Sequence, residues 1–300
     1  MSKVLVTGGA GFIGSHAVER LLSKDHSVYV IDDLSTGKRE NLPEHEKLKF
    51  FERDILDNSL GEIFEKERPD FVIHLAAQVS VSNSVSDPYA DARTNILGSI
   101  NLLRLSKTYN VKKFVAASSA AVYGIPKYLP IDENHPTEPI SPYGLSKVTM
   151  ERYIKLSGVP YVIFRFSNAY GARQYLSKES GVISVFDKVM KNNEQVSIFG
   201  DGAQIRDFVY AGDIAEIFER AISSDVSNET LNFSTNKGIT VNKLFLMMRD
   251  IYGYKKTPVF LPEREGEIRD SILSNEKVVS LLGHDKFKTL SDGLECLRNS

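Results

Sequence analysis

The chain has 300 residues, of which 42% are hydrophobic and 25% are charged, and its formal net charge is −2. This composition is ordinary for a soluble globular chain with one large domain or two smaller ones. The near-neutral charge does not favour binding to nucleic acid or to an anionic membrane, and no apolar run approaches the ~20 residues of a membrane span.

The cysteine and histidine content bears on disulfide bonds, on metal binding and on the cellular location. Cys296 is the only cysteine, so an internal disulfide is impossible, and the six histidines show no zinc-ligand spacing. We therefore expect no metal site. An apolar strand begins almost at the start of the chain, so we expect no signal peptide and a cytoplasmic location.

The first predicted elements are a strand at 3–7, a glycine-rich turn and a helix at about 12–24. Gly9, Gly11 and Gly14 fit the spacing Gly-x-Gly-x-x-Gly in the strand–turn–helix context that gives it meaning. Gly9 would allow a tight turn, Gly11 would let a pyrophosphate approach the backbone, and Gly14 would let helix and strand pack closely. The helix N-terminus would bind the phosphates. The alternative is a glycine-rich turn without a ligand.

The second strand, predicted at 28–32, ends in Asp32 and Asp33. An acid about twenty residues after the glycine turn binds the ribose hydroxyls of a dinucleotide. It would repel the additional phosphate of NADP. The sequence therefore predicts NAD as the cofactor.

Apolar runs and helical patterns continue to alternate as far as residue 166. We expect strands at 48–52, 70–75, 112–118 and 160–166, and helices at about 58–67, 88–109 and 142–157. This alternation is typical of right-handed β-α-β units. It predicts the α/β fold class, with a Rossmann-type doubly wound parallel sheet covered by helices on both faces.

Three features follow the ends of these strands. Asp54 could lie near an adenine or cap the next helix, and the sequence does not decide between the two. His74 has apolar neighbours, so we interpret it as a buried structural residue. Small residues in the segment that follows it, Ala76 and Ala77, would let a cofactor lie against the backbone.

A possible catalytic pair is formed by Tyr143 and Lys147, which share one face of the helix predicted at 142–157. We expect the lysine ammonium, together with the positive nicotinamide ring, to lower the pKa of the tyrosine. The tyrosine could then take a proton from a substrate hydroxyl as hydride leaves the same carbon. Ser118 and Ser119 end the fifth strand at the sheet edge where ligands bind. The alternatives are a surface pair and a strand-end cap.

The regular alternation stops after about residue 165. We expect a helix near 180–192, a strand near 196–199, helices near 212–223 and 240–252, and a small helix pair after 274. These elements predict two domains. Residues 1–165 would form the NAD-binding domain, joined by a returning strand near 230–234, and residues 166–300 would mostly form a smaller, discontinuous substrate-binding lobe.

Over nearly its whole length the chain resembles the extended short-chain dehydrogenase/reductases, and among them the UDP-glucose (UDP-galactose) 4-epimerases. The resemblance rests on Asn95 and on the segments 7–14, 32–37, 74–78, 118–124, 143–147, 165–173, 198–210 and 264–271. It implies a catalytic set of Ser119, Tyr143 and Lys147.

The resemblance also implies two sets of binding residues. Those for NAD are Gly8, Gly11, Phe12, Ile13, Gly14, Asp32, Asp33, Ser35, Thr36, Gly37, Asp54, Ile55, Leu75, Ala76, Ala77, Gln78, Asn95, Ser118, Tyr143 and Lys147. Those for a UDP-sugar are Ser80, Ser119, Tyr143, Asn168, Val182, Ile198, Phe199, Arg206, Arg264, Glu267 and Ser271. Within the second set, Asn168 and the two arginines would bind the diphosphate, and Val182, Ile198 and Phe199 would flank the uracil. For each arginine, an ion pair with the acid next to it is the alternative.

The residues that related enzymes have at positions 119–121 indicate the type of reaction. Related 4,6-dehydratases have Thr-Asp-Glu where this chain has Ser119, Ala120 and Ala121. Alanine cannot move a proton, so the resemblance implies an epimerase that oxidises and re-reduces a single carbinol. The alternatives are another NAD-dependent nucleotide-sugar enzyme, such as a UDP-glucuronate 4-epimerase or a reductase, and a non-catalytic dinucleotide-binding regulator.

Two further expectations come from the resemblance. Ser271 stands where some epimerases carry a bulky tyrosine, so the site would also accept an N-acetyl group, as in UDP-GlcNAc. The helices at 88–109 and 142–157 would pair across a two-fold axis as a four-helix bundle, giving a homodimer. The first of them carries Ile96, Ile100, Leu103 and Leu105 on more than one face, and burial within one subunit is the alternative.

Overall fold

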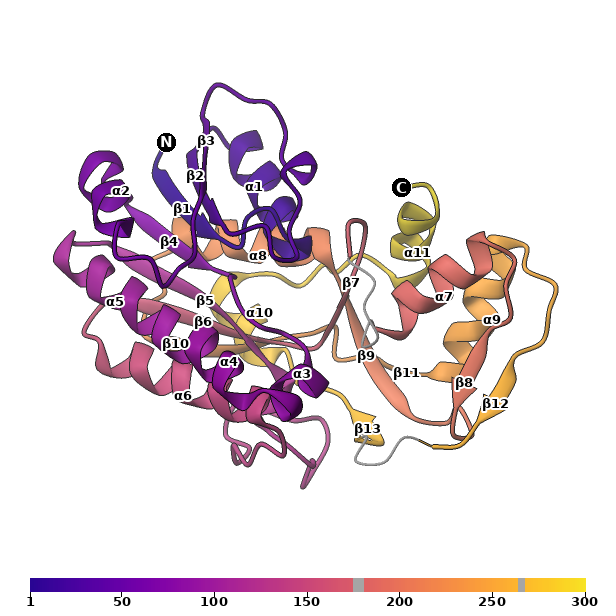
Figure 1. Ribbon diagram of the computed structural model, residues 1–300. Coiled ribbons are helices and arrows are strands. Elements are labelled where there is room, and N and C mark those ends of the chain that lie inside the picture. The colour runs from indigo at the N-terminus through magenta and orange to yellow at the C-terminus, as the bar shows by residue number, and fades with distance from the viewer. Residues whose placement is uncertain (175–180, 264–267) are drawn as a thin grey trace.

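The computed structural model describes residues 1–174, 181–263 and 268–300. Its main layer is a seven-stranded sheet with the order β10-β6-β5-β4-β1-β2-β3 (Figure 1). The strands are β1 (Lys3–Thr7), β2 (Ser27–Asp32), β3 (Leu48–Glu52), β4 (Phe71–His74), β5 (Lys113–Ser119), β6 (Tyr161–Phe166) and β10 (Glu229–Phe233). All neighbours pair in parallel, which confirms the predicted α/β fold class. The strand order reverses between β1 and β4, and ligands bind at such a switch point.

Helices cover both faces of this sheet (Figure 1). One face carries α1 (Phe12–Ser23), α8 (Ala211–Ser223) and α10 (Glu276–Leu282), and the other carries α2 (Leu60–Glu67), α5 (Ser99–Thr108) and α6 (Pro142–Leu156). Successive residues of β1 point to opposite faces, so Val4 and Val6 join one core and Leu5 joins the other.

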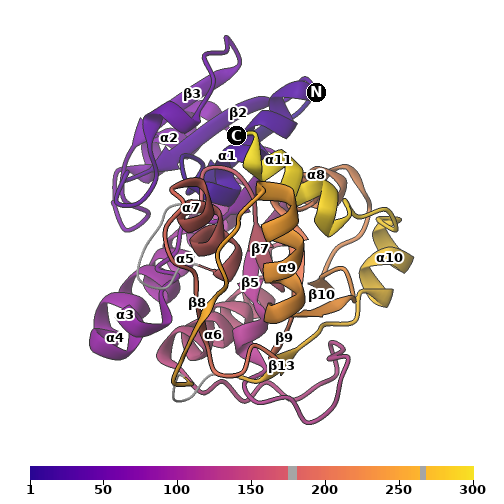
Figure 2. The same ribbon diagram turned by 90° about the vertical axis from the view of Figure 1, so that its right-hand side faces the viewer.

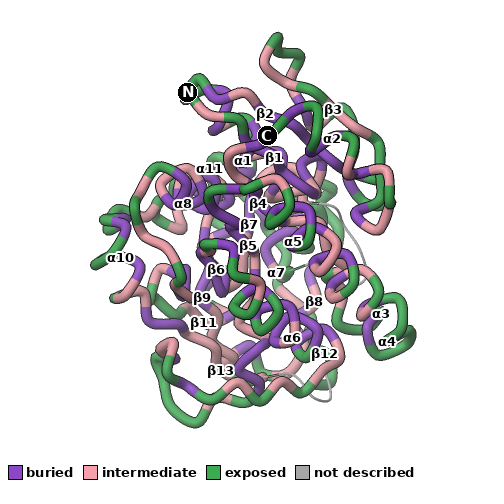
Figure 3. Tube along the Cα trace, turned by 90° about the vertical axis from the view of Figure 1, so that its left-hand side faces the viewer, coloured by how far each residue is buried: buried purple, intermediate pink, exposed green. Residues whose placement is uncertain are grey.

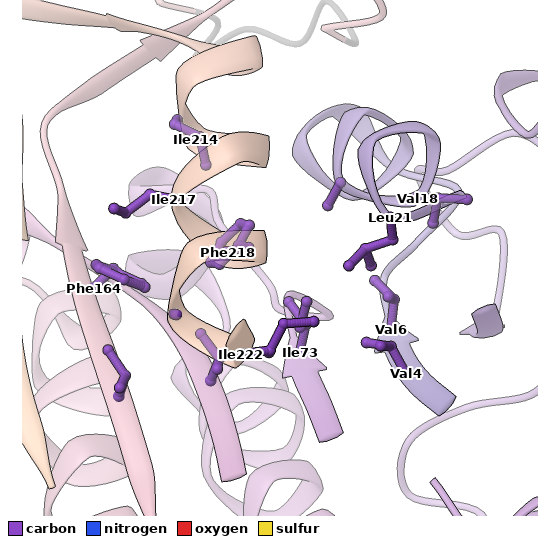
Figure 4. Close-up of a cluster of buried hydrophobic side chains, with 14 of the residues drawn as sticks. Val4, Val6, Val18, Leu21, Ile73, Phe164, Ile214, Ile217, Phe218 and Ile222 are labelled. Atoms are coloured by element: carbon purple, nitrogen blue, oxygen red, sulfur yellow. The ribbon is translucent and has the colours of Figure 1, made fainter. Parts of the chain in front are cut away.

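The core on the α1 and α8 face is shown in Figure 4, where Val18 and Leu21 of α1 lie above the valines of β1. Leu21 and Phe218 are completely buried. Burial of one such side chain contributes roughly 1.5–3 kcal/mol, so these contacts hold the glycine turn between β1 and α1 in place.

The second half of the chain adds a smaller body beside the sheet, seen end-on in Figure 2. A four-stranded sheet contains β7 (Asn168–Tyr170), β9 (Ile205–Tyr210), β11 (Gly238–Thr240) and β13 (Asp270–Ser271). A two-stranded sheet contains β8 (Ser197–Phe199) and β12 (Val259–Leu261). The helices are α7 (Val182–Lys191), α9 (Val241–Tyr252) and α11 (Leu290–Arg298), and they share a core that includes Phe186, Phe245 and Leu294.

The helix predicted at 88–109 is divided. It consists of α4 (Pro88–Ala92), a π-helical turn η2 (Arg93–Gly98) and α5, and it follows an unpredicted helix α3 (Val81–Ser86). Gly98 in the π turn packs so closely that a Cβ would lie 2.4 Å from the Ile55 side chain. Leu103 and Leu105 are buried within the subunit, whereas Ile96 and Ile100 are half-buried.

Sequence patterns missed β7, β9, β11, β12 and β13 because most of these strands have two or three residues, too few for an alternating pattern. Burial along the chain is greatest in the strands of the large sheet and in the helix faces that cover it (Figure 3). None of the helices in the described ranges has both the length and the apolar character that a bilayer crossing requires.

Candidate active site

The glycine turn after β1 is too tight for side chains. Gly8 has a φ of +69°, and a Cβ there would lie 2.6 Å from the Ala76 nitrogen. A Cβ on Gly14 would lie 2.0 Å from the Gly8 carbonyl oxygen, so α1 packs directly on the turn, as predicted. The left-handed residue is Gly8 rather than Gly9, which instead leaves room for Val30.

The N-terminus of α1 opens at this turn. Gly11 is its N-cap, no side chain caps it, and its first turn carries no acidic residue. The first N–H groups of the helix, at Phe12, Ile13 and Gly14, therefore have no partner within the helix itself. Backbone donors and the positive end of the helix dipole at a cradle without side chains fit the pyrophosphate of NAD.

The two acids at the end of β2 have different surroundings. Asp32 is buried, and its oxygens accept hydrogen bonds from the N–H groups of Ala10 and Leu34, both at 2.9 Å. Burial raises its pKa. Asp33 is exposed, and its Oδ1 accepts from the amide and the hydroxyl of Ser35 at 3.0 and 2.6 Å. Asp32 thus ties the glycine turn to β2, whereas Asp33 is exposed at the end of that strand and binds Ser35.

The segment after these acids closes against the turn. A Cβ on Gly37 would lie 2.9 Å from Asp32 Oδ1, and the amide of Lys38 donates to the Ala10 carbonyl at 3.0 Å. Thr36 is exposed at the rim. The structure therefore brings residues 35–37 beside the predicted cofactor cradle.

Asp54 does not cap a helix. Its Oδ1 accepts from the amide of Leu56 at 2.9 Å in a local turn, and the N-cap of α2 is Ser59. The helix-cap alternative is therefore wrong. Asp54 is exposed beyond the end of β3, whereas Ile55 is buried against the π turn.

Residues after β4 are held to the glycine turn through Thr7. Its hydroxyl accepts from the amides of Leu75 and Ala76 at 3.2 and 3.3 Å. The Gln78 amide donates to Asn95 Oδ1, and Asn95 Nδ2 donates back to the Gln78 carbonyl, both at 2.9 Å. These bonds place the predicted cofactor residues 75–78 and the π turn side by side.

The two serines at the end of β5 play different roles. The Ser118 hydroxyl is buried and donates to Glu151 Oε1 at 2.6 Å, so this side chain is committed to the protein interior. The Ser119 hydroxyl accepts from the Ala121 amide at 3.2 Å and caps a short 3-10 turn, η3 (Ala120–Val122). Ser119 also acts on the pKa of Tyr143, so its capping role does not prevent a role in the site.

Tyr143 and Lys147 are buried rather than on the surface. They are 9% and 4% exposed, and α6 begins at Pro142 after the N-cap Ser141. Lys147 Nζ donates to the Ala117 carbonyl at 3.1 Å and lies 6.0 Å from the centre of the Tyr143 ring. The surface-pair alternative is therefore wrong.

Burial dominates the electrostatics of this pair. Burial raises the pKa of Tyr143 to about 12, against the opposing effect of the Ser119 hydrogen bond. Burial also lowers the pKa of Lys147 to about 8, while the charges of Asp91 and Glu151 act to raise it. Burial outweighs the opposing effect of Ser119, so the protein's own groups raise the pKa of this tyrosine.

Sequence patterns missed the charged residues behind the pair. Arg165 of β6 donates to both oxygens of Glu151, at 2.9 and 2.6 Å, and all of these groups are buried. Asp91 is also buried and accepts from Asn95. The spacing of Glu151, one turn after Lys147 on α6, could have indicated the first group, but no sequence signal links Arg165 to it.

The predicted UDP-sugar residues lie mostly on the smaller body. Asn168 of β7 donates to the Asp207 carbonyl at 3.0 Å, and Ser271 of β13 stands beside Arg206 of β9. Arg206 Nη1 donates to the carbonyls of Ile205 and Arg269 at 3.0 and 2.7 Å.

The remaining residues predicted to bind the UDP-sugar differ in their burial and in the elements that carry them. Val182 begins α7, Phe199 is partly exposed, and Ile198 is buried in the core of the smaller body. Ser80 is the N-cap of α3. Arg264 and Glu267 lie outside the described residues.

Known proteins are similar to this chain over most of its length. The NAD dependent epimerase/dehydratase family matches residues 4–233. A relative from Methanocaldococcus jannaschii, which carries the provisional name UDP-glucose 4-epimerase, is 46% identical over 93% of this chain and 92% of its own.

Two solved structures are also similar. The UDP-glucose 4-epimerase of Thermotoga maritima, solved with UDP-glucose, has a TM-score of 0.95 at 42% identity and covers 99% of this chain and 97% of its own. The UDP-N-acetylglucosamine 4-epimerase of Methanobrevibacter ruminantium, solved with UDP-N-acetylmuramic acid, has a TM-score of 0.93 at 36% identity with the same coverage. The chain therefore belongs to the NAD dependent epimerase/dehydratase family.

Proposed function

We propose that this protein is an NAD-dependent 4-epimerase that interconverts UDP-glucose and UDP-galactose. The observation that carries the proposal is the buried pair Tyr143 and Lys147 on α6, with Ser119 at the carboxyl end of β5, which α6 contacts. Relatives named as UDP-glucose 4-epimerases, similar over nearly the whole chain, support the same activity.

The residues present suit reversible oxidation of one secondary alcohol. Ser119 would hydrogen-bond the 4-hydroxyl oxygen, and Tyr143 would accept its proton. Bound NAD supplies the acceptor, and later the donor, of the C4 hydride. The positive charges of Lys147 and of the oxidised cofactor favour the phenolate, which burial by itself disfavours. Tyr143 would return the proton after the 4-keto sugar has presented its opposite face.

The UDP part of the substrate is assigned to the smaller body. Arg206 has a planar guanidinium suited to a diphosphate, and Asn168 lies on the neighbouring strand. We assign residues 1–165 with β10 to NAD binding and most of 166–300 to the UDP-sugar. The small Ser271 leaves room for an acetylated sugar, so we propose that UDP-GlcNAc is also a substrate.

A homodimer and a cytoplasmic location complete the proposal. Leu97, Leu145 and Tyr153 are exposed on η2 and α6, with Leu145 58% exposed. These two elements contact each other, and a second copy packed on them would cover a face that carries these exposed side chains. Such a face is suited to pairing with a second copy through a four-helix bundle.

The test is turnover of UDP-galactose to UDP-glucose with added NAD, followed by separation of the two sugars. Tyr143→Phe removes the proton acceptor and should lower kcat about 100-fold or more. Tyr153→Phe, the same change on an exposed part of α6, should leave it unchanged. Stoichiometric consumption of NADH in place of catalytic turnover would indicate a reductase, and unchanged turnover in Tyr143→Phe would reject the assigned base.

A further inference from the structure

Among the described residues, one buried carboxylate on α4, a helix that contacts α6, has no cation in hydrogen-bond contact. Asp91 of α4 is 1% exposed, and its Oδ1 accepts from Gln78 Nε2 at 2.9 Å and from Asn95 Nδ2 at 3.0 Å. Both donors are neutral amides. Burying a carboxylate is costly without hydrogen bonds or an opposite charge, so a cation nearby would stabilise Asp91 further.

The charges buried around this carboxylate separate into two sets. Glu151 of α6 is bound through both oxygens by Arg165 of β6, and the Ser118 hydroxyl donates to it as well. That set is neutral by itself. Asp91 and Lys147 remain, one negative and one positive, and each is almost fully buried.

The other titratable groups that face Lys147 do not change this balance. His74 of β4 is kept neutral, since burial lowers its pKa to about 3. Tyr143 is neutral as a phenol, since its pKa is raised to about 12. The negative charge of Asp91 acts on both members of the catalytic pair.

Hydrogen bonds also connect Asp91 to the catalytic helix. Asn95 Nδ2 lies 3.1 Å from the Ser146 hydroxyl oxygen, and that hydroxyl donates to the Tyr143 carbonyl at 2.9 Å. Asp91 and Asn95 are separated by the start of the π turn η2. Interruptions of this kind are frequent at functional sites, because they reorient side chains on a helix.

We propose that Asp91 is a positioning residue of the epimerase site, which balances the charge of the Lys147 ammonium and fixes Gln78 and Asn95 against α6. Its effect on catalysis rests on the proposed function. The charge balance itself does not, because it can be measured in the folded protein without turnover.

The first test is the pH dependence of kcat in Asp91→Asn, which keeps the shape of the side chain and removes its charge. Lys147 would lose its counter-charge and Tyr143 would lose a repelling neighbour, so the pKa of each should fall. The kcat profile should therefore move to lower pH by about one unit, the shift expected from one nearby charge. A lower rate with an unmoved profile would mean a merely structural role and would overturn the proposal.

Asp87→Asn is the matched control. Asp87 is the exposed N-cap of the same helix, and asparagine caps helices equally well. The profile of this variant should coincide with that of the unaltered enzyme. If the unaltered enzyme itself does not epimerise UDP-hexoses, the proposed function fails, and the charge balance is decided by the second test.

The second test compares thermal unfolding of Asp91→Asn, Lys147→Met and the double variant. Each single change leaves one buried charge without its counter-charge, whereas the double change removes both. The double variant should have a higher Tm than either single variant, and it should fold even if Asp91→Asn does not. A double variant whose Tm falls by the sum of the two single effects, or that also fails to fold, would overturn the charge balance.

Discussion

His74 shows how neighbouring groups can fix the state of one side chain. The Ser99 hydroxyl donates to the Asn95 carbonyl, so it must accept from His74 Nε2–H. The Thr7 hydroxyl accepts two backbone amides and donates to His74 Nδ1. Both ring nitrogens are therefore satisfied only in the neutral Nε2–H form. The sequence-based interpretation of a buried structural histidine agrees with this geometry.

A pH dependence of stability follows from the neutral His74. Its folded-state pKa is depressed to about 3, so between about pH 6.5 and 3 the unfolded state binds the proton and the folded state does not. Stability is full above pH 6.5 and falls with acidification by up to roughly 1.4 kcal/mol per pH unit from this group. His74→Gln should reduce the slope of unfolding free energy against pH over this window, measured by urea denaturation.

The slope should be reduced rather than abolished, because burial also lowers the pKa of His16, His26 and His284. Exposed His45→Gln is the control and should leave the slope unchanged. An identical slope in His74→Gln would show that this histidine does not contribute.

Ser271 decides substrate range in the proposed function. It lies on β13 in register with Arg206, and its side chain is much smaller than that of a tyrosine. Ser271→Tyr should lower kcat/KM for UDP-GlcNAc about 10-fold or more, with little change for UDP-glucose, because the added ring occupies the space of the acetyl group. Ser271→Ala should retain both activities. Equal losses for both sugars in Ser271→Tyr would reject the idea.

At the scale of elements, β1, the glycine turn and α1 act as one unit. The helix α1 packs on the sheet through Val18 and Leu21, and it packs on the glycine turn through Gly14. These two contacts hold the unit together. The unit was predictable from sequence because its signals are local: an apolar strand, a fixed glycine spacing and a helical pattern. The division of the helix predicted at 88–109 was not predictable, because its π turn accommodates Ile55, which is distant in sequence.

Gly14→Ala tests this unit. Its new Cβ would meet the Gly8 carbonyl, so α1 must shift away from the cradle, with a stability loss of about 1–3 kcal/mol. NAD affinity, measured by calorimetry, should fall as well. Gly61→Ala in α2 is a matched control, since its Cβ would make only an ordinary contact with Leu105 at 3.8 Å. If Gly14→Ala kept full NAD affinity, the close packing of α1 on the glycine turn would not be needed for NAD binding, contrary to this prediction.

At the scale of the whole molecule, the proposed dimer makes a separate prediction. Leu145→Arg places a charge on the exposed apolar face of η2 and α6, where desolvation on pairing would be unfavourable. Light scattering should then give the mass of a monomer. Leu281→Arg changes an exposed leucine on α10 and should leave the dimer intact. A monomeric unaltered protein would reject the dimer.

The sequence by itself determined the parallel sheet, the glycine turn and the pairing of Tyr143 with Lys147, because these depend on residues close together in the chain. Only the tertiary structure decided which acid is buried, that the tyrosine pKa is raised, that Glu151 meets Arg165, and that the buried Asp91 accepts from Asn95. Burial and charge balance depend on contacts between distant segments, such as the bond from Tyr123 to Asn232 across 109 positions. Local patterns carry no information on such contacts, because many partners would satisfy the same pattern.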